Sequence, residues 1–336
     1  MEHIGFPTET VLLFVVVVLL SLFLDLYAHK RDEDISLKSA CLWSVFWVLL
    51  SVGFGIYLYV HHSAEMASLF FTGYVLEKVL SVDNLFVIMA IFSWFSIPGK
   101  YRHRVLYWGV LGAIVFRAIF VAIGTELLSF GPYMEVIFAG MVGYTAFMML
   151  RKREEKEEIK DYSNHIAFRM VRRFFPVWPK LNGHDFFLRR SEAEAQSARE
   201  GVPLEGIGHK CAYVATPLFL CLAVIEVSDV MFAFDSVPAV IAVSREPLII
   251  YSAMIFAILG LRSLYFVLES LSSRLVYLET SVVVLLFFIT IKLLLSACNH
   301  LFGIGFEISP HLSLVIVLAV LVIGIVASFV VPKKQQ

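Results

Sequence analysis

Nine apolar stretches dominate this chain, and each is long enough to cross a lipid bilayer as a helix. A spanning helix needs about 20 mostly apolar residues, because the hydrocarbon core is about 30 Å thick. The 336 residues are 59% hydrophobic and 16% charged, with a mean hydropathy of +0.82. We therefore predict an all-α, polytopic transmembrane helical bundle. The predicted spans are residues 8–29, 38–61, 65–95, 103–126, 131–150, 211–244, 247–271, 276–299 and 311–331.

The loops between these spans alternate in their content of Lys and Arg. Basic residues occur in the first, third, fifth and seventh loops and in the C-terminal tail, and they are rare in the other loops. Cytoplasmic loops carry an excess of Lys and Arg, so we predict an external N-terminus and a cytoplasmic C-terminus. The formal net charge of −1 gives no reason to expect a nucleic-acid partner.

Two short acidic segments lie inside the third and sixth predicted spans, and they match each other. Each has a carboxylate, five residues, a second carboxylate and then a small polar side chain. An ionised carboxylate at the bilayer centre costs about 2.5–3.5 kcal/mol, so a repeated pattern of them indicates a functional site. The pattern consists of Glu77, Asp83 and Asn84 in the first segment and Asp229, Asp235 and Ser236 in the second, with Glu226 just upstream.

The predicted topology makes the third and sixth spans run in opposite directions, which is the arrangement of an inverted repeat. Secondary transporters are often built this way, with ion sites near the midplane at the repeat interface. In each half, the acidic span is followed by a span with an arginine, Arg117 or Arg262. The predicted divisions are two N-terminal helices (1–62), a first repeat half (63–150), a cytoplasmic loop (151–210), a second repeat half (211–299), and a last helix with a cytoplasmic tail (300–336).

Helical spacing places some of the acidic-segment residues together and separates others. Glu77 and Asn84 share one helix face, whereas Asp83 and Asp235 each lie about 120° away from the face of their own segment in a straight helix. Pro238 would break or kink the sixth span, because it lacks an N–H and its ring is bulky. We therefore predict broken helices at the midplane, which would let the two aspartates converge.

The donor atoms of these segments select the kind of ion that they could bind. Carboxylates, an amide and hydroxyls are hard oxygen donors, which suit Mn²⁺, Ca²⁺ or Mg²⁺ and suit copper(I) poorly. Zinc sites usually contain His or Cys, and neither occurs in the acidic segments. The excess of negative charge favours a divalent cation or protons and disfavours an oxyanion.

Four motifs resemble those of the TerC family of integral membrane proteins, within the LysE-like transporter group. They are Thr72–Phe86, Arg104–Arg117, Ala215–Pro238 and Phe256–Phe266. Within the family, the sequence looks most similar to the tellurite-resistance branch. The resemblance implies export of manganese across the bacterial inner membrane, and a resistance system with soluble partners. Carried over by motif, the metal ligands are Glu77, Asp83, Asn84, Glu226, Asp229, Asp235 and Ser236.

Other charged residues within the spans have two interpretations each. Lys78 could pair with a carboxylate or extend to the membrane surface. We expect Arg117 and Arg262 to neutralise buried carboxylates rather than to contact the substrate. Asp25 and His29, one helical turn apart, are either an interfacial pair or a proton relay at the cytoplasmic entrance.

The only long polar segment, residues 151–210, is either a solvated connector or a docking site for soluble stress-resistance proteins. Its aromatic and basic stretch, 168–178, suits a membrane surface. We expect the stretch 191–208 to be flexible.

Two functions fit this sequence. The first is a secondary transporter that exports a hard divalent cation, with Mn²⁺ favoured over Ca²⁺ and Mg²⁺ and with protons as the counter-ion. The second is a membrane scaffold of a resistance complex that transports nothing. We expect neither a tightly bound cofactor nor an enzyme, since the chain has no ATP-binding loop motif and no recognisable nucleophile and base.

Overall fold

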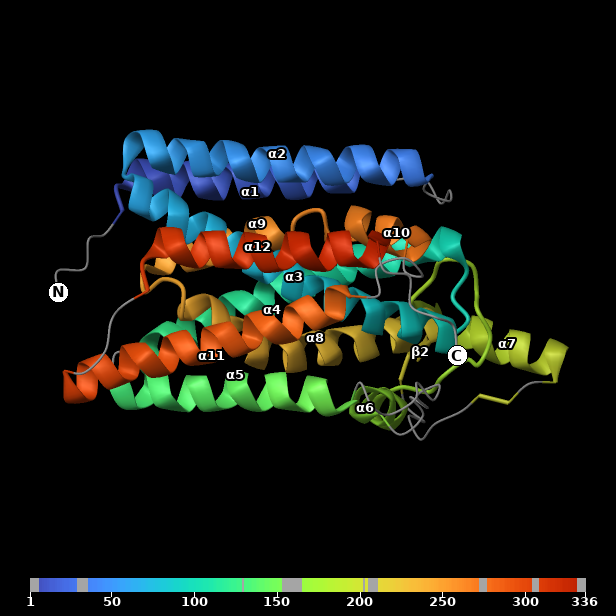
Figure 1. Ribbon diagram of the computed structural model, residues 1–336. Coiled ribbons are helices and arrows are strands. Elements are labelled where there is room, and N and C mark those ends of the chain that lie inside the picture. The colour runs from blue at the N-terminus through green and yellow to red at the C-terminus, as the bar shows by residue number, and fades with distance from the viewer. Residues whose placement is uncertain are drawn as a thin grey trace.

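The protein is a bundle of long helices that run along one common axis, with a small α/β unit at one end (Figure 1). A computed structural model describes residues 6–28, 36–128, 130–152, 165–201, 203–204, 211–271, 277–303 and 308–330. We call the end with the α/β unit the loop end. The bundle helices are α1 (Thr8–Ala28), α2 (Leu37–His61), α3 (Ala64–Trp94), α4 (Gly99–Leu128), α5 (Pro132–Lys152), α8 (Pro217–Ile241), α9 (Pro247–Ile258), α10 (Leu261–Leu271), α11 (Leu278–Phe302) and α12 (Pro310–Val330).

The predicted polytopic helical bundle is confirmed, and the ends of most predicted spans agree with the helices to within a few residues. Among the described residues, seven helices are long and apolar enough to cross a membrane, or eight if α9 and α10 form one bent span. Helix α3 is long enough, with 31 residues, but it is not among the seven because Glu77, Lys78 and Asp83 lie close together within it. The count of nine spans, which needs α3, stays a prediction.

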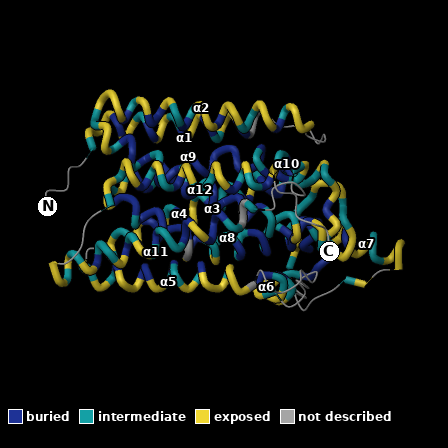
Figure 2. Tube along the Cα trace, in the orientation of Figure 1, coloured by how far each residue is buried: buried dark blue, intermediate teal, exposed yellow. Residues whose placement is uncertain are grey.

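The outer surface of the bundle is apolar, as a lipid environment requires. Leu19, Leu20 and Phe23 on α1 are 60%, 62% and 67% exposed. Figure 2 shows exposed positions along the outer helices and buried positions between them. Apolar patches of this extent are rare on soluble monomers, so the exposed face is a membrane-contacting one.

The helix pairings are unchanged when the two predicted repeat halves are exchanged. Helix α3 packs against α9, and α8 packs against α4; α5 and α11 pack against each other. Exchanging α3 with α8, α4 with α9–α10, and α5 with α11 reproduces the same pairings. An inverted repeat requires this pattern, although the repeat itself remains a prediction.

The chain breaks a membrane helix at a different place from the one predicted. Both α3 and α8 are continuous, and α8 passes through Pro238. Pro238 lies in the last turn of α8, and the helix continues through it to Ile241 although the missing N–H removes one backbone hydrogen bond. The break instead separates α9 from α10, which are bent by 49°.

Gly260 makes the break between α9 and α10. Its φ of +80° is a left-handed conformation that other L-residues adopt at a cost. A Cβ at this position would lie 2.5 Å from Cδ1 of Trp47 on α2, so the glycine also permits close contact between helices.

The first testable prediction concerns this glycine. We expect Gly260→Ala to lower the stability of the folded protein by about 1–3 kcal/mol, through backbone strain and the contact with Trp47. Gly303→Ala is the matched control, because Gly303 has a φ of +65° but open space around its Cβ position. Thermal unfolding of purified protein in detergent measures both. Equal destabilisation by the two variants would show that the Trp47 contact contributes nothing.

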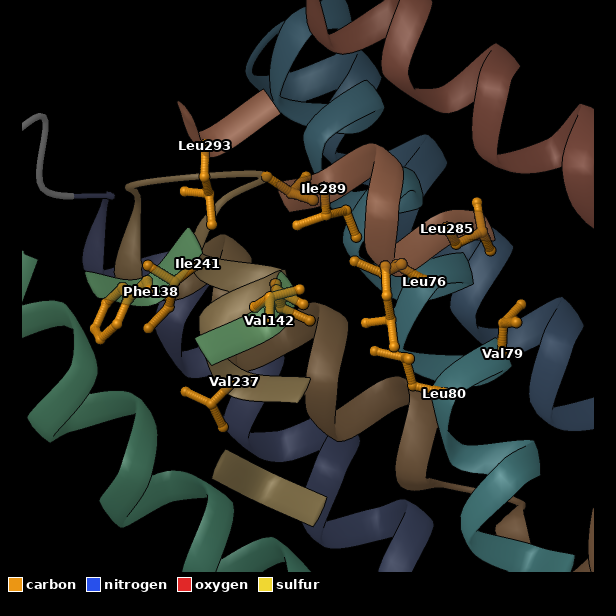
Figure 3. Close-up of a cluster of buried hydrophobic side chains, with 14 of the residues drawn as sticks. Leu76, Val79, Leu80, Phe138, Val142, Val237, Ile241, Leu285, Ile289 and Leu293 are labelled. Carbon is orange, nitrogen blue, oxygen red and sulfur yellow. The ribbon is translucent and has the colours of Figure 1, made fainter. Parts of the chain in front are cut away.

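Two buried hydrophobic clusters meet at the level of the acidic segments. One contains the residues around Leu76 and Leu80 of α3 with Val237 of α8, and it extends to α5 and α11 (Figure 3). The other contains Val82 to Phe92 of α3 with the first part of α8. The acidic residues therefore lie near the middle of the bundle, with packed apolar side chains on both sides along the bundle axis.

The loop end contains a folded unit of four short elements, α6 (Ile166–Phe174), β1 (Phe187–Arg189), α7 (Arg190–Glu200) and β2 (Tyr213–Ala215). The two strands are antiparallel, with Phe187 opposite Ala215. Trp178, Leu188 and Val214 are buried together. The expected flexibility of 191–208 is wrong for α7, while 202 and 205–210 lie outside the described residues.

Candidate cation site

Arg117 on α4 joins the two acidic helices. Its side chain forms ion pairs with Glu77 on α3 and, over 3.3 Å from Nη2 to Oδ1, with Asp229 on α8. Arg117 is 1% exposed and Glu77 is 0% exposed. One buried guanidinium thus bridges a carboxylate from each predicted repeat half.

The carboxylates around Arg117 use only part of their hydrogen-bonding capacity. The Ser81 hydroxyl donates to Glu77 Oε1 over 3.2 Å, as the i, i+4 spacing allows. Among the described residues, Glu77 Oε2 and Asp229 Oδ2 have no hydrogen-bond partner although both are buried. Buried polar atoms are normally paired, so these two oxygens are available to a ligand.

Glu226 lies against the backbone of α4 at Gly112. A Cβ on Gly112 would be 2.1 Å from Glu226 Oε1 and 2.2 Å from Oε2, so the absence of a side chain there makes room for the carboxylate. Glu226 precedes Asp229 by three residues, which places both on one face of α8. Its Oε2 is a third buried oxygen without a hydrogen-bond partner in the described part of the chain.

The described charges at this level of the bundle do not balance. Glu77, Glu226 and Asp229 supply three carboxylates, whereas the cations are Arg117 and Lys78, whose ammonium bonds to carbonyls at the end of α9. Removing charges from water is costly unless partners compensate for the lost hydration. The arrangement therefore favours a further cation, whether a metal ion or a proton.

The structure brings together some of the predicted ligands and leaves others untested. Asn84 and Ser236 are 8% and 2% exposed, and Ser236 Oγ has no hydrogen-bond partner among the described residues. The side chains of Asp83 and Asp235 lie outside the described part of the structure, so their convergence stays a prediction. Within the described residues, no three His, Cys, Asp or Glu side chains are grouped closely enough to hold a metal ion.

Lys78 has a role that neither interpretation of the sequence anticipated. Its ammonium donates to the carbonyl oxygens of Ala257, over 2.9 Å, and Leu259, over 3.2 Å. These are carbonyls at the C-terminal end of α9, where the break leaves them without helical partners. A cation is also favoured there by the helix dipole, so Lys78 stabilises the break.

Arg262 neutralises a carboxylate as expected, but this carboxylate is on α1 and outside the acidic segments. Its Nη2 lies 2.6 Å from Asp25 Oδ1 and donates to the Asp25 carbonyl oxygen over 2.8 Å. Asp25 is buried, and its role as part of an interfacial pair stays a prediction. His29 lies outside the described residues, and the proton relay through Asp25 and His29 stays a prediction.

Two features of the site region were missed by sequence reasoning. The first is the contact of Glu226 with Gly112, for which the only signal was a glycine five residues before an intramembrane arginine. The second is a cluster near the end opposite the loop end, in which buried Glu135 forms an ion pair with Arg245 and lies 3.5 Å from Nδ1 of His300. Glu135 is in the first turn of α5, so it resembles an ordinary helix-end residue in the sequence.

Known proteins share this sequence over nearly its full length. Tellurium resistance protein TerC of Serratia marcescens is 62% identical over 337 residues, covering 99% of this chain and 97% of that protein. Its namesake from an Alcaligenes species is 61% identical over 336 residues, with the same coverage of both chains. Thylakoid membrane protein TERC, chloroplastic, of Arabidopsis thaliana is 36% identical over 302 residues, covering 90% of this chain and 70% of that protein.

No solved structure matches the chain. A family profile described as "Integral membrane protein TerC family" matches residues 62–336, which include the three helices that supply the candidate site. With this match and the two relatives above 60% identity, the chain belongs to the TerC family of multi-pass integral membrane proteins.

Proposed function

We propose that this protein is a secondary transporter that exports a hard divalent cation, with Mn²⁺ as the leading candidate, across the bacterial inner membrane. The observation that carries the proposal is the surplus of buried carboxylates around Arg117, with three oxygens that have no hydrogen-bond partner among the described residues. The predicted orientation places the N-terminus outside and the loop end in the cytoplasm.

The donor set supports a hard cation as the substrate. Glu77, Glu226 and Asp229 offer carboxylate oxygens, Asn84 offers an amide and Ser236 a hydroxyl, and no Cys or His belongs to the set. Mn²⁺, Ca²⁺ and Mg²⁺ prefer these ligands. Asp83 and Asp235 would add two further carboxylates if their side chains turn toward the others.

In the proposed transport cycle, Arg117 neutralises the carboxylates when no metal ion is bound. Its guanidinium contacts Glu77 and Asp229, so a divalent cation that binds the remaining oxygens of these carboxylates would compete with the guanidinium for their charge. The arginine would neutralise the carboxylates again when the cation leaves. Protons are the proposed counter-ion, because the same carboxylates can hold a proton in place of the metal.

The link to tellurium resistance is proposed to be indirect. Two relatives above 60% identity are named tellurium resistance protein TerC. Tellurite is an oxyanion, however, and a site with surplus carboxylates repels anions. We therefore propose that the protein contributes to tellurite and metal stress resistance through metal homeostasis.

A second candidate function is a membrane scaffold that recruits soluble resistance proteins without transport. The observation that favours it is the folded unit at the loop end, where Trp178, Leu188 and Val214 pack around a short sheet. A unit with its own small core can present a defined surface to a partner, which a flexible connector cannot.

The proposed function is tested by Mn²⁺ uptake into inverted membrane vesicles. We expect Asp83→Asn and Asp235→Asn each to lower the uptake rate at least tenfold, because each removes a predicted ligand charge. Glu65→Gln is the matched control, since Glu65 is an exposed carboxylate on the same helix as Asp83 and should leave uptake unchanged.

Three outcomes of this experiment are informative. Normal transport by both well-inserted aspartate variants would refute their assignment as ligands. If wild type moves no divalent ion, the scaffold function replaces the transporter. Uptake of Ca²⁺ or Mg²⁺ in preference to Mn²⁺ would overturn the choice of ion and leave the hard-cation site intact.

A further inference from the structure

Helix α6 lies across the bundle axis at the loop end. Figure 1 shows α6 almost end on, whereas α5 and α8 beside it run along the bundle. It packs against α8, and buried Val171 belongs to a cluster with Leu220 of that helix. If the bundle axis is normal to the membrane, α6 runs parallel to the membrane surface at the edge of the bundle.

The exposed part of α6 contains an apolar stripe. Ile166, Met170 and Phe174 are spaced four residues apart, so they cover about 80° of the helix surface. They are 60%, 52% and 59% exposed. The adjoining face, with Ala167 and Val171, is buried against the protein, so the stripe continues an apolar surface outward from the bundle.

Arginines border this stripe on the side away from the protein. Arg169 and Arg173 are exposed, and in a regular helix they lie next to Ile166 on the side opposite to Val171. The Arg172 guanidinium lies 5.5 Å from the ring centroid of Phe168. Around its axis, α6 thus has a protein-facing side, an apolar exposed side and a basic side.

We propose that α6 is a lipid-binding helix that inserts Ile166, Met170 and Phe174 into the cytoplasmic leaflet and binds anionic phospholipid headgroups through Arg169 and Arg173. Helices that lie in the membrane interface have this division into apolar and basic faces. Arginine attracts the phosphate of anionic lipids, and the effect of each cation extends about a Debye length. The proposal does not depend on cation transport.

The charge pattern favours lipid over a soluble protein as the occupant of the stripe. The stripe adjoins the apolar face through which Val171 of α6 packs against α8, and the basic side follows it directly. The cytoplasmic leaflet is negatively charged and begins at this level of the bundle if the predicted orientation holds. An anionic bilayer therefore matches both faces of α6 at once.

The first arm of the test measures what surrounds the stripe in the full-length protein. A spin label is attached at Met170→Cys in liposomes containing phosphatidylglycerol, after replacement of Cys41, Cys211 and Cys298; buried Cys221 is kept. Collisions with oxygen report lipid, and collisions with a water-soluble nickel chelate report water. Leu20→Cys on the exposed face of α1 is the lipid control, and Ala198→Cys on α7 is the water control.

We expect the label at residue 170 to match the lipid control, with higher accessibility to oxygen than to the chelate. A label that matches the water control would overturn the proposal. Low accessibility to both reagents would also overturn it, because a protein partner or a second copy of the chain would then cover the stripe.

The second arm measures lipid selectivity by native mass spectrometry of the purified protein with phosphatidylglycerol or phosphatidylcholine. We expect Arg169→Gln/Arg173→Gln to lower the preference for phosphatidylglycerol at least tenfold, since each arginine near an anionic surface contributes about fivefold. The control Arg189→Gln/Arg199→Gln removes the same charge from exposed positions outside α6. An unchanged preference in the α6 variant, or an equal loss in the control, would contradict the proposal.

Discussion

Replacing Arg117 with glutamine is expected to lower the stability of the folded protein by about 3–5 kcal/mol. The change leaves the Glu77 carboxylate buried and without its cation, and uncompensated buried charges cost about this much. Asp229 loses its ion pair in the same step. Thermal unfolding of detergent-purified protein, with the yield of monodisperse material as a second readout, measures the effect.

Two further variants make the Arg117 result specific. Arg151→Gln changes an exposed arginine at the end of α5 and should leave the unfolding midpoint within about a degree of wild type, since surface substitutions cost little. Glu77→Gln/Arg117→Gln removes the main buried pair together and should recover much of the loss. If Arg117→Gln unfolds like wild type, the ion pair does not contribute to stability as described.

Gly112→Ala is expected to lower transport at least tenfold while the fold is retained. The added Cβ would occupy the space of the Glu226 carboxylate, which lies at the end of a flexible side chain and can move aside. Displacing a functional group by about 1 Å can reduce its effect a hundredfold. The variant thus moves a carboxylate without changing any charge, and Mn²⁺ uptake into vesicles measures the result.

Gly109→Ala provides the matched control one helical turn earlier on α4. Its Cβ would lie 3.6 Å from Cγ2 of Ile225, which is ordinary van der Waals contact. We expect its transport rate to stay within about twofold of wild type, because this contact displaces no carboxylate. Both variants change helix propensity by the same amount, so a difference between them reports on Glu226. Equal transport by Gly109→Ala and Gly112→Ala would show that the position of Glu226 is unimportant.

The parts of the fold that depend on local sequence could be predicted well. Long apolar stretches predicted most helix ends to within a few residues, as in α2, predicted at 38–61 and observed at Leu37–His61; α8 begins six residues later than predicted. Intramembrane charge predicted positions that are buried in the bundle, because its energetic cost makes each instance informative. The buried positions of Glu77 and Arg117 follow from that logic.

The parts that depend on tertiary contacts could not be predicted. The sequence of α8 contains a proline and that of the bent span contains Gly260, but the left-handed φ of Gly260 and its close approach to Trp47 exist only in the folded structure. Lys78 bonds to carbonyls of a helix nearly 180 residues away, and the sequence contains no signal for that contact. Similarly, the two arginines occupy matching places in the repeat pattern, yet Arg117 lies between the acidic helices while Arg262 pairs with α1.

We propose that the carboxylates around Arg117 carry a hard cation across the membrane. We would measure Mn²⁺ flux into liposomes that contain only the purified protein, either wild type or Glu226→Gln. The variant removes the charge of one candidate ligand, the carboxylate that lies against Gly112. We predict saturable Mn²⁺ flux for wild type and a reduction of at least tenfold for the variant. Wild-type liposomes that are no more permeable to Mn²⁺ than protein-free liposomes would contradict the account.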